Sequence, residues 1–580
     1  MTSALPGPSP ASQAVDAESA GAARTARRWA RIGALVICLF VVGIVAARSA
    51  GRRATQDVLF DDETQYLWYG VTLATEGPPA ADFSPLYAAW YWVQSHVVHD
   101  RVDLYYANWS LVMLALLLAV ALALRRLGVP PIVVVPALAV IACMTLMDAW
   151  PYPTHLGAAA VALAMALALR RRSVFEGLLA ASATFAIAAF VRPELAVPFW
   201  GTWVAAVALA RRRRLRSLAL LALPLALFVA LVAAFGNPLG GVRSFAAFGQ
   251  YYLYNLAAAQ SSPVDVWNSD FWAEIRHHFG NASSIWQAAV ANPRAMVWQI
   301  RTNLSHAVGL RYQLGPQVEV KDATYHLYRL TIVVLASGLA LAAIRAVRAA
   351  RRGAPADDRR RAGTVIGLAA LAGGPLMLPL LVVYPTPHHA FGLIVLSLLV
   401  AAWGWQPLAA RIPVLNATPR RQALAAAVLG AVILALLPGR TGSGVWWRAR
   451  GTPPELPNLA TIRVLRALQA PQGRPVTILE SEFSRAVYTG WDFRRIDQRS
   501  CTPFAACMER EHPDVIVCTA RLDDHYRLAH DADYFALLAA PERQEYRGVA
   551  VPDSDVLVLW RSPEPSGGAP GAASDSSSRR

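Results

Sequence analysis

Charged side chains are scarce in this chain of 580 residues. Asp, Glu, Lys and Arg make up 16% of the sequence, hydrophobic residues make up 55%, and the mean hydropathy is +0.35. About a quarter of the residues of a typical soluble domain are charged. The shortage of charge therefore excludes an ordinary soluble protein and indicates a membrane protein.

Lysine is almost missing as well, because Lys321 is the only one and arginine supplies nearly all of the positive charge. The formal net charge of +16 does not indicate a nucleic-acid partner, since the arginines fall in short clusters between apolar runs. That distribution is typical of membrane topology, in which basic residues flank the membrane-spanning helices on the cytoplasmic side.

Several sequence motifs of cofactor and nucleotide sites are also absent. The chain has no P-loop, no dinucleotide-binding glycine fingerprint and no nucleophile elbow. Its five cysteines lack the spacing of a four-ligand zinc site. Energy for any reaction must therefore come from the substrate or from a gradient. For Cys501 and Cys507 we predict a disulfide, which fits an oxidising compartment.

Long apolar runs dominate what is present. A helix needs about 20 residues to cross roughly 30 Å of hydrocarbon. Runs of about this length, some of them short, lie at 30–47, 106–124, 129–147, 155–169, 174–190, 195–210, 217–235, 327–347, 363–384, 389–405 and 422–438. They predict a polytopic α-helical membrane protein with about eleven transmembrane helices.

Arginine clusters between these runs predict the orientation. If the N-terminus is cytoplasmic, all of the clusters lie on the cytoplasmic side of the membrane. These clusters are 24–31, 125–126, 170–172, 211–216, 345–361 and 411–421. Arg52 and Arg53 are the exception, on the outside after the first run. The first run has the basic flank of a signal peptide, but its apolar stretch is longer, so we favour an uncleaved anchor.

Four parts of the chain follow from this pattern. We expect residues 1–28 and 562–580 to be disordered, 29–438 to form the membrane domain, and 439–561 to form a small extracytoplasmic α/β domain. Strand-like runs at 476–479, 515–518 and 556–559 alternate there with helical stretches at 458–470 and 533–540. Two loops, 48–105 and 236–326, should face the same compartment as this domain.

Three acids follow directly after the first apolar run, in Phe60-Asp61-Asp62-Glu63-Thr64-Gln65-Tyr66-Leu67. Carboxylates near a bilayer are costly to bury, so their presence indicates a functional site. The alternative is a solvated loop or a helix start, where acids are common.

The order of these features resembles the GT-C superfamily of polyprenyl-phosphate-sugar-dependent glycosyltransferases, in the branch of the protein O-mannosyltransferases and aminoarabinose transferases. The residues that carry the resemblance are Asp62, Glu63 and Tyr66 after the first span, the Pro85-Leu86-Tyr87 segment, Asp148 in the next external loop, and the Arg192-Pro193-Glu194 turn. It covers roughly residues 30–440. Asp61 before the acid pair and His388-His389 in the late external loop depart from the family pattern.

The resemblance implies roles for these residues. Asp62 is the expected catalytic base, with Glu63 or Asp148 orienting the acceptor or holding a divalent ion, and Asp61 leaves the choice of base open by one position. Arg192 is the first candidate for the donor phosphate, and His388 and His389 are the second. Tyr66 and Tyr87, together with Trp90, are candidates for an acceptor groove. The donor would be a polyprenyl-phosphate-linked sugar, and no cofactor beyond an optional divalent cation is implied.

The chemistry fits these residue types independently of the family. Transfer of a sugar from a lipid phosphate needs a base for the acceptor and positive groups for the leaving phosphate. A single displacement at the anomeric carbon inverts its configuration. We therefore expect a glycosyltransferase of the bacterial inner (plasma) membrane, in contact with membrane lipids and with its active site on the extracytoplasmic side. A transporter or lipid flippase is the alternative, and a catalytically silent assembly subunit is a third possibility.

Overall fold

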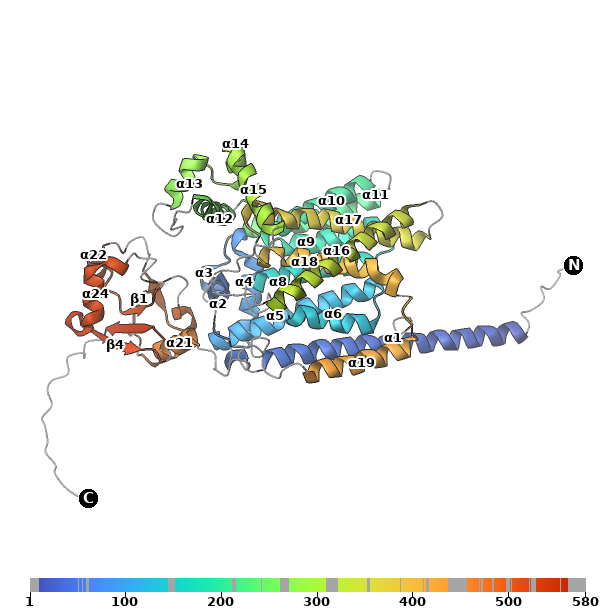
Figure 1. Cartoon of the computed structure of the whole chain (residues 1–580), viewed down its shortest axis with the longest axis horizontal. Helices are drawn as coiled ribbons and strands as arrows, with labels where there is room; N and C mark the ends of the chain where they lie inside the picture. Colours follow the sequence, from blue (N-terminus) through green and yellow to red (C-terminus); the bar gives the residue numbers. More distant parts are fainter. Residues whose placement is uncertain are drawn as a thin grey trace, which may run out of the picture.

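Helices account for most of the chain in the computed structural model (Figure 1). The structure describes residues 10–561 except for 51, 55, 59–61, 144–151, 211–214, 241, 261–270, 309–321, 352–354, 386, 410, 414–416, 437–455, 469, 471–472, 482–484, 497–500, 502, 521, 523–527 and 553.

Long helices form a bundle. Its main members are α1 (Pro10–Ser49), α5 (Arg101–Leu127), α6 (Pro131–Cys143), α8 (Tyr152–Arg170), α9 (Val174–Ala188), α10 (Ala196–Ala210), α11 (Leu215–Phe235), α16 (Asp322–Ala350), α17 (Ala356–Leu378), α18 (Pro387–Ala409) and α19 (Pro419–Leu436). Each predicted apolar run overlaps one of these helices, while 144–147 and 437–438 lie outside the described residues and the run 363–384 continues past the end of α17. Among the described residues, seven helices are long and apolar enough to cross a membrane, and three further apolar helices are shorter. The chain is therefore a helical membrane protein.

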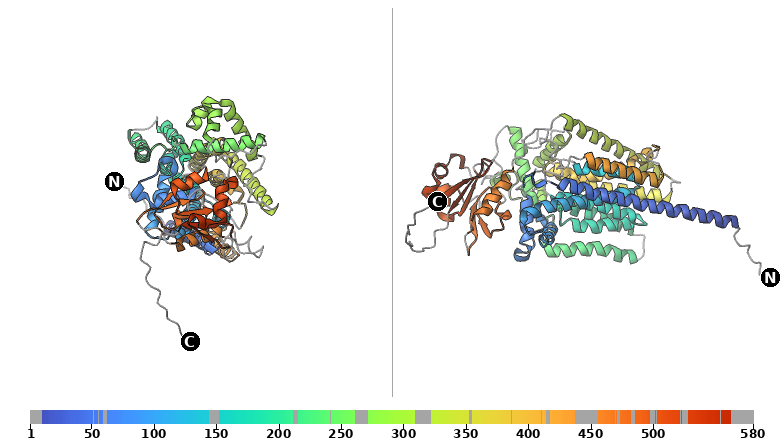
Figure 2. Two further views of the ribbon diagram at one scale, coloured as in Figure 1. Left: turned by 90° about the vertical axis from the view of Figure 1, so that its left-hand side faces the viewer. Right: turned by 90° about the horizontal axis from the view of Figure 1, so that it is seen from below.

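Shorter elements cover one end of this bundle. They are η1 (Arg52–Ala54), α2 (Asp62–Val71), α3 (Leu73–Glu76), η2 (Ala81–Phe83), α4 (Pro85–Ser95) and η3 (Pro193–Leu195), with α12 (Val242–Gln260), α13 (Phe271–Phe279), α14 (Ile285–Ala291), α15 (Pro293–Val308) and the π-helical turn η4 (Pro379–Val383). The C-terminal domain lies at the same end, and α1 extends beyond the bundle at the other (Figures 1 and 2). We call the first of these the domain end.

Arginines at the opposite end bind the carbonyl groups where helices terminate. Arg345 in α16 donates to the Trp403 carbonyl oxygen and to Gln406, both at 2.7 Å. Arg360 in α17 donates to the carbonyl oxygen of Arg171, just past α8, at 2.5 Å. Pro407, four residues after Trp403, has no N–H to bond the Trp403 carbonyl, and Arg171 lies past the end of α8, so these guanidinium groups bind carbonyl groups that lack a helical partner. The basic clusters of several helices thus meet at one end of the bundle.

The two arginines that break the sequence pattern lie at the domain end. The guanidinium carbon of Arg52 sits 3.6 Å from the ring centroid of Trp109, and Arg52 is 2% exposed. Arg53 forms a salt bridge with Asp103. Both arginines therefore have a partner within the protein at this end.

The C-terminal domain contains one five-stranded sheet, in the order β2-β1-β3-β5-β4. Its strands are β1 (Val476–Leu479), β2 (Phe493–Arg495), β3 (Val515–Cys518), β4 (Tyr546–Ala550) and β5 (Leu557–Arg561), and its helices are α21 (Pro457–Ala467), α22 (Phe504–Glu511) and α24 (Ala532–Ala539), with turns η5 (Arg485–Tyr488), η7 (Leu528–His530) and η8 (Pro541–Gln544). β2, β1 and β3 are parallel, whereas β5 pairs antiparallel with both β3 and β4.

The three predicted strands are present as β1, β3 and β5, and the two predicted helical stretches as α21 and α24. Strands β2 and β4 and helix α22 were not predicted. The predicted disulfide between Cys501 and Cys507 is present, with the Cα atoms 4.6 Å apart.

Candidate functional site

Helix α2 begins at Asp62 and places Asp62 and Glu63 in its first turn. The partial positive charge of a helix N-terminus stabilises acids there. Both residues therefore lie at a helix start, as the alternative interpretation of the acid cluster expects. Their surroundings differ, however. The Asp62 side chain is 40% exposed, whereas Glu63 is 3% exposed. The two neighbouring carboxylates are therefore suited to different tasks.

Arg243, near the start of α12, binds the carboxylate of Asp62. Its Nη2 donates to Asp62 Oδ2, its Nη1 donates to the Tyr66 hydroxyl at 2.6 Å, and its backbone N–H donates to Asp82 Oδ2 at 3.2 Å. Burial alone would lower the pKa of Arg243, but the facing Tyr66 and Asp62 raise it above its ordinary value. The guanidinium therefore stays charged and holds Asp62 in an ion pair.

Glu63 lies inside the protein and accepts three hydrogen bonds on one oxygen. Tyr87 donates to Glu63 Oε1 at 2.8 Å, Asn108 donates from Nδ2 at 3.0 Å, and the Tyr91 hydroxyl also donates. Burial, followed by the negative charge of Glu63, raises the pKa of Tyr91 well above its usual range. A buried carboxylate is tolerated only with such donors, so Glu63 joins α2 to α4 and α5.

Close packing of α2 against α4 brings these donors within reach. A Cβ on Gly70 would lie 2.3 Å from the Tyr91 Cβ, so only glycine permits this approach. Asn108 is oriented from its other side, because Trp90 Nε1 and Gln94 Nε2 donate to its Oδ1 at 2.8 and 3.1 Å. The amide group of Asn108 thus presents its Nδ2 to Glu63.

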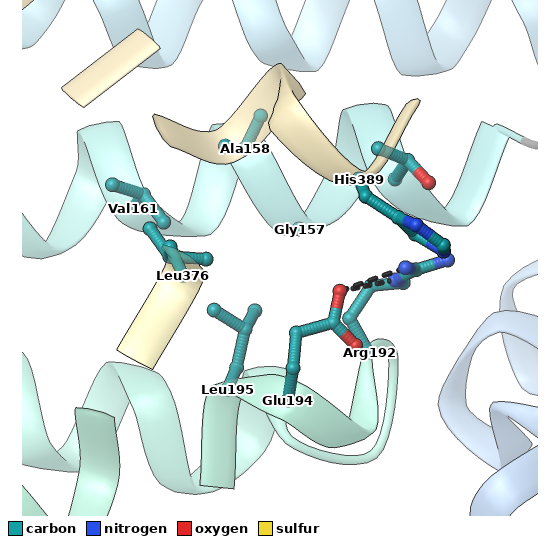
Figure 3. Close-up of a pocket in the computed structure, with 10 residues that line it drawn as sticks. Gly157, Ala158, Val161, Arg192, Glu194, Leu195, Leu376 and His389 are labelled. Atoms are coloured by element: carbon teal, nitrogen blue, oxygen red, sulfur yellow. Dashed lines mark hydrogen bonds and ion pairs between the residues drawn. The ribbon is translucent and has the colours of Figure 1, made fainter. Parts of the chain in front are cut away.

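Arg192, Glu194 and His389 line a small cavity, whose other walls come from α8, α17 and α18 (Figure 3). Arg192 Nε donates to Glu194 Oε1 at 2.8 Å, and its Nη2 lies 2.7 Å from the same oxygen. The Arg192 stem packs on α8, where a Cβ on Gly157 would lie 2.9 Å from Arg192 Cγ. The other lining residues are Thr154, Ala158, Val161, Leu195, Leu376 and Gly392.

Tyr66 binds Arg243 through its hydroxyl and also lies within reach of the charge of Arg192. Burial raises its pKa, and the positive charges of Arg243 and Arg192 offset part of that rise. The ring also packs edge-on against Tyr87, with centroids 5.4 Å apart. Tyr66 and Tyr87 are 2% and 0% exposed. In this conformation neither ring is accessible to an acceptor. An acceptor groove would therefore have to be lined by other residues than Tyr66 and Tyr87.

His389 is fixed by the backbone before it. Its Nδ1 lies 2.9 Å from the Tyr384 carbonyl oxygen. The tautomer that donates from Nδ1 satisfies this carbonyl and leaves Nε2 as an acceptor. Tyr384 in turn stacks on Tyr251 of α12, with centroids 4.8 Å apart and planes 9° apart. Helix α12 therefore contacts the site twice, through Arg243 and through Tyr251.

Two amides of α15 hold the π-helical turn η4 that precedes Tyr384. Gln299 donates to the Val383 carbonyl oxygen at 2.9 Å, and Asn303 donates to the carbonyl oxygens of Leu381 and Val383 at 2.9 and 3.0 Å. Asn255 of α12 donates to the oxygens of both amides at 2.9 Å. These buried side chains satisfy carbonyl groups that the turn leaves without regular helical partners.

Three predicted site residues lie outside what the structure describes. These are Asp61 and Asp148, and the side chain of His388. Among the side chains that are described, no three His, Cys, Asp or Glu residues gather closely enough to hold a metal ion. Asp62 and Glu63 instead have Arg243 and three neutral donors as partners. Among the described residues, these partners of Asp62 and Glu63 do not form a metal site.

Sequence reasoning missed Arg243, Tyr91 and Asn108. Arg243 had one usable signal, since it lies in a predicted external loop, away from the clusters that mark the other side. Tyr91 and Asn108 had none, because an Asn and a Tyr among apolar residues are unremarkable until a carboxylate is placed beside them.

No family model and no curated protein sequence matches the chain. The case for a function therefore depends on the side chains described above and on the short motifs that carry the resemblance to the GT-C superfamily.

Proposed function

We propose that this chain is a GT-C-type membrane glycosyltransferase that moves a sugar from a polyprenyl-phosphate donor to a lipid, polysaccharide or protein acceptor. One observation carries the proposal: Asp62, partly exposed, shares an ion pair with Arg243, which also donates to the Tyr66 hydroxyl, and the charge of Arg192 acts on the same tyrosine. A carboxylate base and two phosphate-binding groups in one place are what the reaction requires.

In this proposal the protein has eleven spans in a bacterial plasma membrane. The end of the bundle where Arg345 and Arg360 bind helix carbonyls faces the cytoplasm. The domain end, with α2 and the C-terminal domain, faces the extracytoplasmic side, where a lipid-linked sugar and its acceptor would meet. An odd number of spans agrees with Figure 1, in which the first part of α1 and the C-terminal domain lie at opposite ends of the bundle.

The ion pair supplies a way to coordinate donor binding with activation of the base. A guanidinium binds phosphate oxygens through two parallel hydrogen bonds, as it binds a carboxylate. The donor phosphate competes with Asp62 for Arg243 and with Glu194 for Arg192. Asp62 is then released as a free carboxylate only when the donor is present, which limits transfer of the sugar to water.

The transfer itself is a single displacement. The acceptor oxygen or nitrogen attacks the anomeric carbon while its proton passes to the Asp62 carboxylate. The bond from the anomeric carbon to the phosphate oxygen breaks, and the phosphate leaves with the electron pair. Arg243 and Arg192 neutralise the charge that develops on it. The configuration at the anomeric carbon is inverted, and no covalent enzyme intermediate forms.

Glu63 and His389 have supporting places in this mechanism. The three donors on Glu63 Oε1 fix the first turn of α2 and hence the position of Asp62. His389 lines the same cavity as Arg192, and the Tyr384 carbonyl oxygen fixes its ring through Nδ1, so it helps to orient a group bound there.

Lipid mass spectrometry on cells of the native host tests the proposal. Three strains are compared: wild type, Asp62→Asn, and Asp103→Asn as a control, because Asp103 also pairs with an arginine at the domain end. We expect a polyprenyl-phosphate sugar to accumulate in Asp62→Asn alone, at membrane levels equal to wild type. Equal lipid pools in all three strains would contradict the proposal, and loss of solute flux in Asp62→Asn would favour a transporter.

A further inference from the structure

The C-terminal domain contacts the segment that carries the acids through its helix α21. Asp57, from the stretch just before α2, accepts hydrogen bonds from the backbone N–H groups of Asn458 and Leu459 at 2.7 and 2.9 Å. Asn458 Nδ2 donates to the Val58 carbonyl oxygen at 2.8 Å. The first N–H groups of a helix have no partner within it, so Asp57 caps α21 from about 400 residues away.

A second contact reaches α2 itself. The hydroxyl of Tyr488, at the end of turn η5, lies 2.9 Å from the hydroxyl of Thr64, and both residues are 0% exposed. Thr64 follows Asp62 and Glu63 in the first turn of α2. Tyr488 also packs edge-on against Tyr105 of α5, with centroids 6.2 Å apart. The C-terminal domain therefore bonds to the acid-bearing turn inside the protein.

Surrounding contacts hold the Tyr488 backbone in place. Arg466 of α21 donates to the Tyr488 carbonyl oxygen at 2.6 and 3.1 Å and pairs with Asp100 at 2.8 Å. Arg101 donates to the Val487 carbonyl oxygen at 2.8 Å. The interface thus joins α21 and η5 to the start of α5 by charge-assisted hydrogen bonds.

Apolar packing continues across the same interface. Trp68 of α2 contacts Phe493 of β2, with ring centroids 5.0 Å apart. Leu459, Ile462 and Val487 belong to the same buried cluster as the bundle core. A domain that shares a core with its neighbour moves with it, unlike one attached through a small polar interface.

A helix of ten residues such as α2 has little stability of its own, so neighbouring contacts decide where it lies. The Glu63 network holds one side of α2, and Tyr488 with Phe493 holds another. We propose that the C-terminal domain is a positioning element of the site and that Tyr488 acts through Thr64 to set the position of Asp62. Tyr488 is a positioning residue that does not touch the substrate.

Hydrogen exchange of the full-length protein in nanodiscs tests this directly, without substrate. Tyr488→Phe removes only the hydroxyl, and Tyr546→Phe is the matched control, because the buried Tyr546 hydroxyl donates to the Pro513 carbonyl oxygen within the domain at 2.5 Å. We expect exchange in 62–71 to rise about tenfold in Tyr488→Phe. Unchanged exchange there, with Tyr546→Phe also unchanged, would overturn the proposal.

Two further variants sharpen the test. Thr64→Val should reproduce the effect of Tyr488→Phe, and the double variant should show no more than either alone, since both remove one hydrogen bond. If Tyr488→Phe is not recovered from membranes, Arg466→Gln loosens the same backbone without altering the buried pair and should also raise exchange in 62–71. Additive effects of the first two changes would contradict the role assigned to Tyr488.

The activity measurement rests on the proposed function. For a glycosyltransferase, Tyr488→Phe should lower kcat several-fold with little change in the donor KM, because donor-binding residues are untouched. If exchange in α2 rises but no transfer is found even in the wild type, the positioning role stands and the proposed function fails.

Discussion

Arg243 donates a hydrogen bond to the carboxylate of Asp62 from 181 residues further along the chain. The pair joins the start of α2 to the start of α12. In the absence of a ligand the guanidinium neutralises the expected base.

Replacing Arg243 should show whether transfer depends on its binding of the donor phosphate or only on its pairing with Asp62. Arg243→Gln removes a phosphate-binding group but frees Asp62, so we expect transfer to fall at least a hundredfold, while the donor lipid accumulates as in Asp62→Asn. Arg53→Gln is the control, because Arg53 also pairs with an aspartate at the domain end. Lipid mass spectrometry measures both, and normal lipid pools in Arg243→Gln would count against the role of Arg243.

Substitution of the two adjacent acids should lower the free energy of unfolding by different amounts. Glu63→Ala leaves three buried donors without their acceptor, so we expect the free energy of unfolding to fall by about 1–3 kcal/mol. Asp62→Asn alters a partly exposed pair, which should cost less than about 1 kcal/mol. Denaturation of both variants in the same detergent checks this. Equal stability of Glu63→Ala and wild type would show that the network contributes nothing.

Acidification should weaken the interface between the C-terminal domain and α5 through Asp100. Burial raises the pKa of Asp100, but the Asp103 backbone N–H and Arg466 lower it more, so its pKa lies below the ordinary value. The stabilisation is therefore complete above about pH 4 and is lost as the pH falls through the lower folded-state pKa.

Asp100→Asn tests this, because asparagine still caps α5 but cannot pair with Arg466. The stability difference between wild type and Asp100→Asn should be full at pH 7 and shrink below about pH 4. A difference that stayed constant down to pH 3 would contradict the assignment.

The side chain of Asn303 should stabilise the π-helical turn η4, which precedes His389. Asn303→Leu removes the donor of two buried carbonyl groups, so we expect a loss of about 1–3 kcal/mol and faster hydrogen exchange around 379–389. Gln287→Leu, at an exposed position of α14, is the control. If exchange in 379–389 is the same in both variants, the amides do not hold the turn.

The helices could be predicted because apolar runs long enough to span a membrane are visible in the sequence without tertiary information. β1, β3 and β5 could be predicted because the interior of a sheet makes strands continuously apolar. β2 and β4 are edge strands with mostly exposed residues, so Phe493–Arg495 and Tyr546–Ala550 carry no such pattern.

The site could be predicted only in part. Local composition marked Asp62, Glu63 and Arg192, since charges near a bilayer are conspicuous. The difference between Asp62 and Glu63 arises from the partners that the fold supplies, Arg243 for one and Tyr87, Tyr91 and Asn108 for the other. Such partners are distant in sequence, so adjacent acids look alike until the chain is folded.

The most direct test of the central claim is turnover by the purified protein in nanodiscs. The substrate is the lipid-linked sugar that accumulates in Asp62→Asn cells, and the measured product is free polyprenyl phosphate in the presence of a membrane extract as acceptor. The account predicts release by the wild type and a rate at least a hundredfold lower for Asp62→Asn. Equal rates for the two proteins would contradict it.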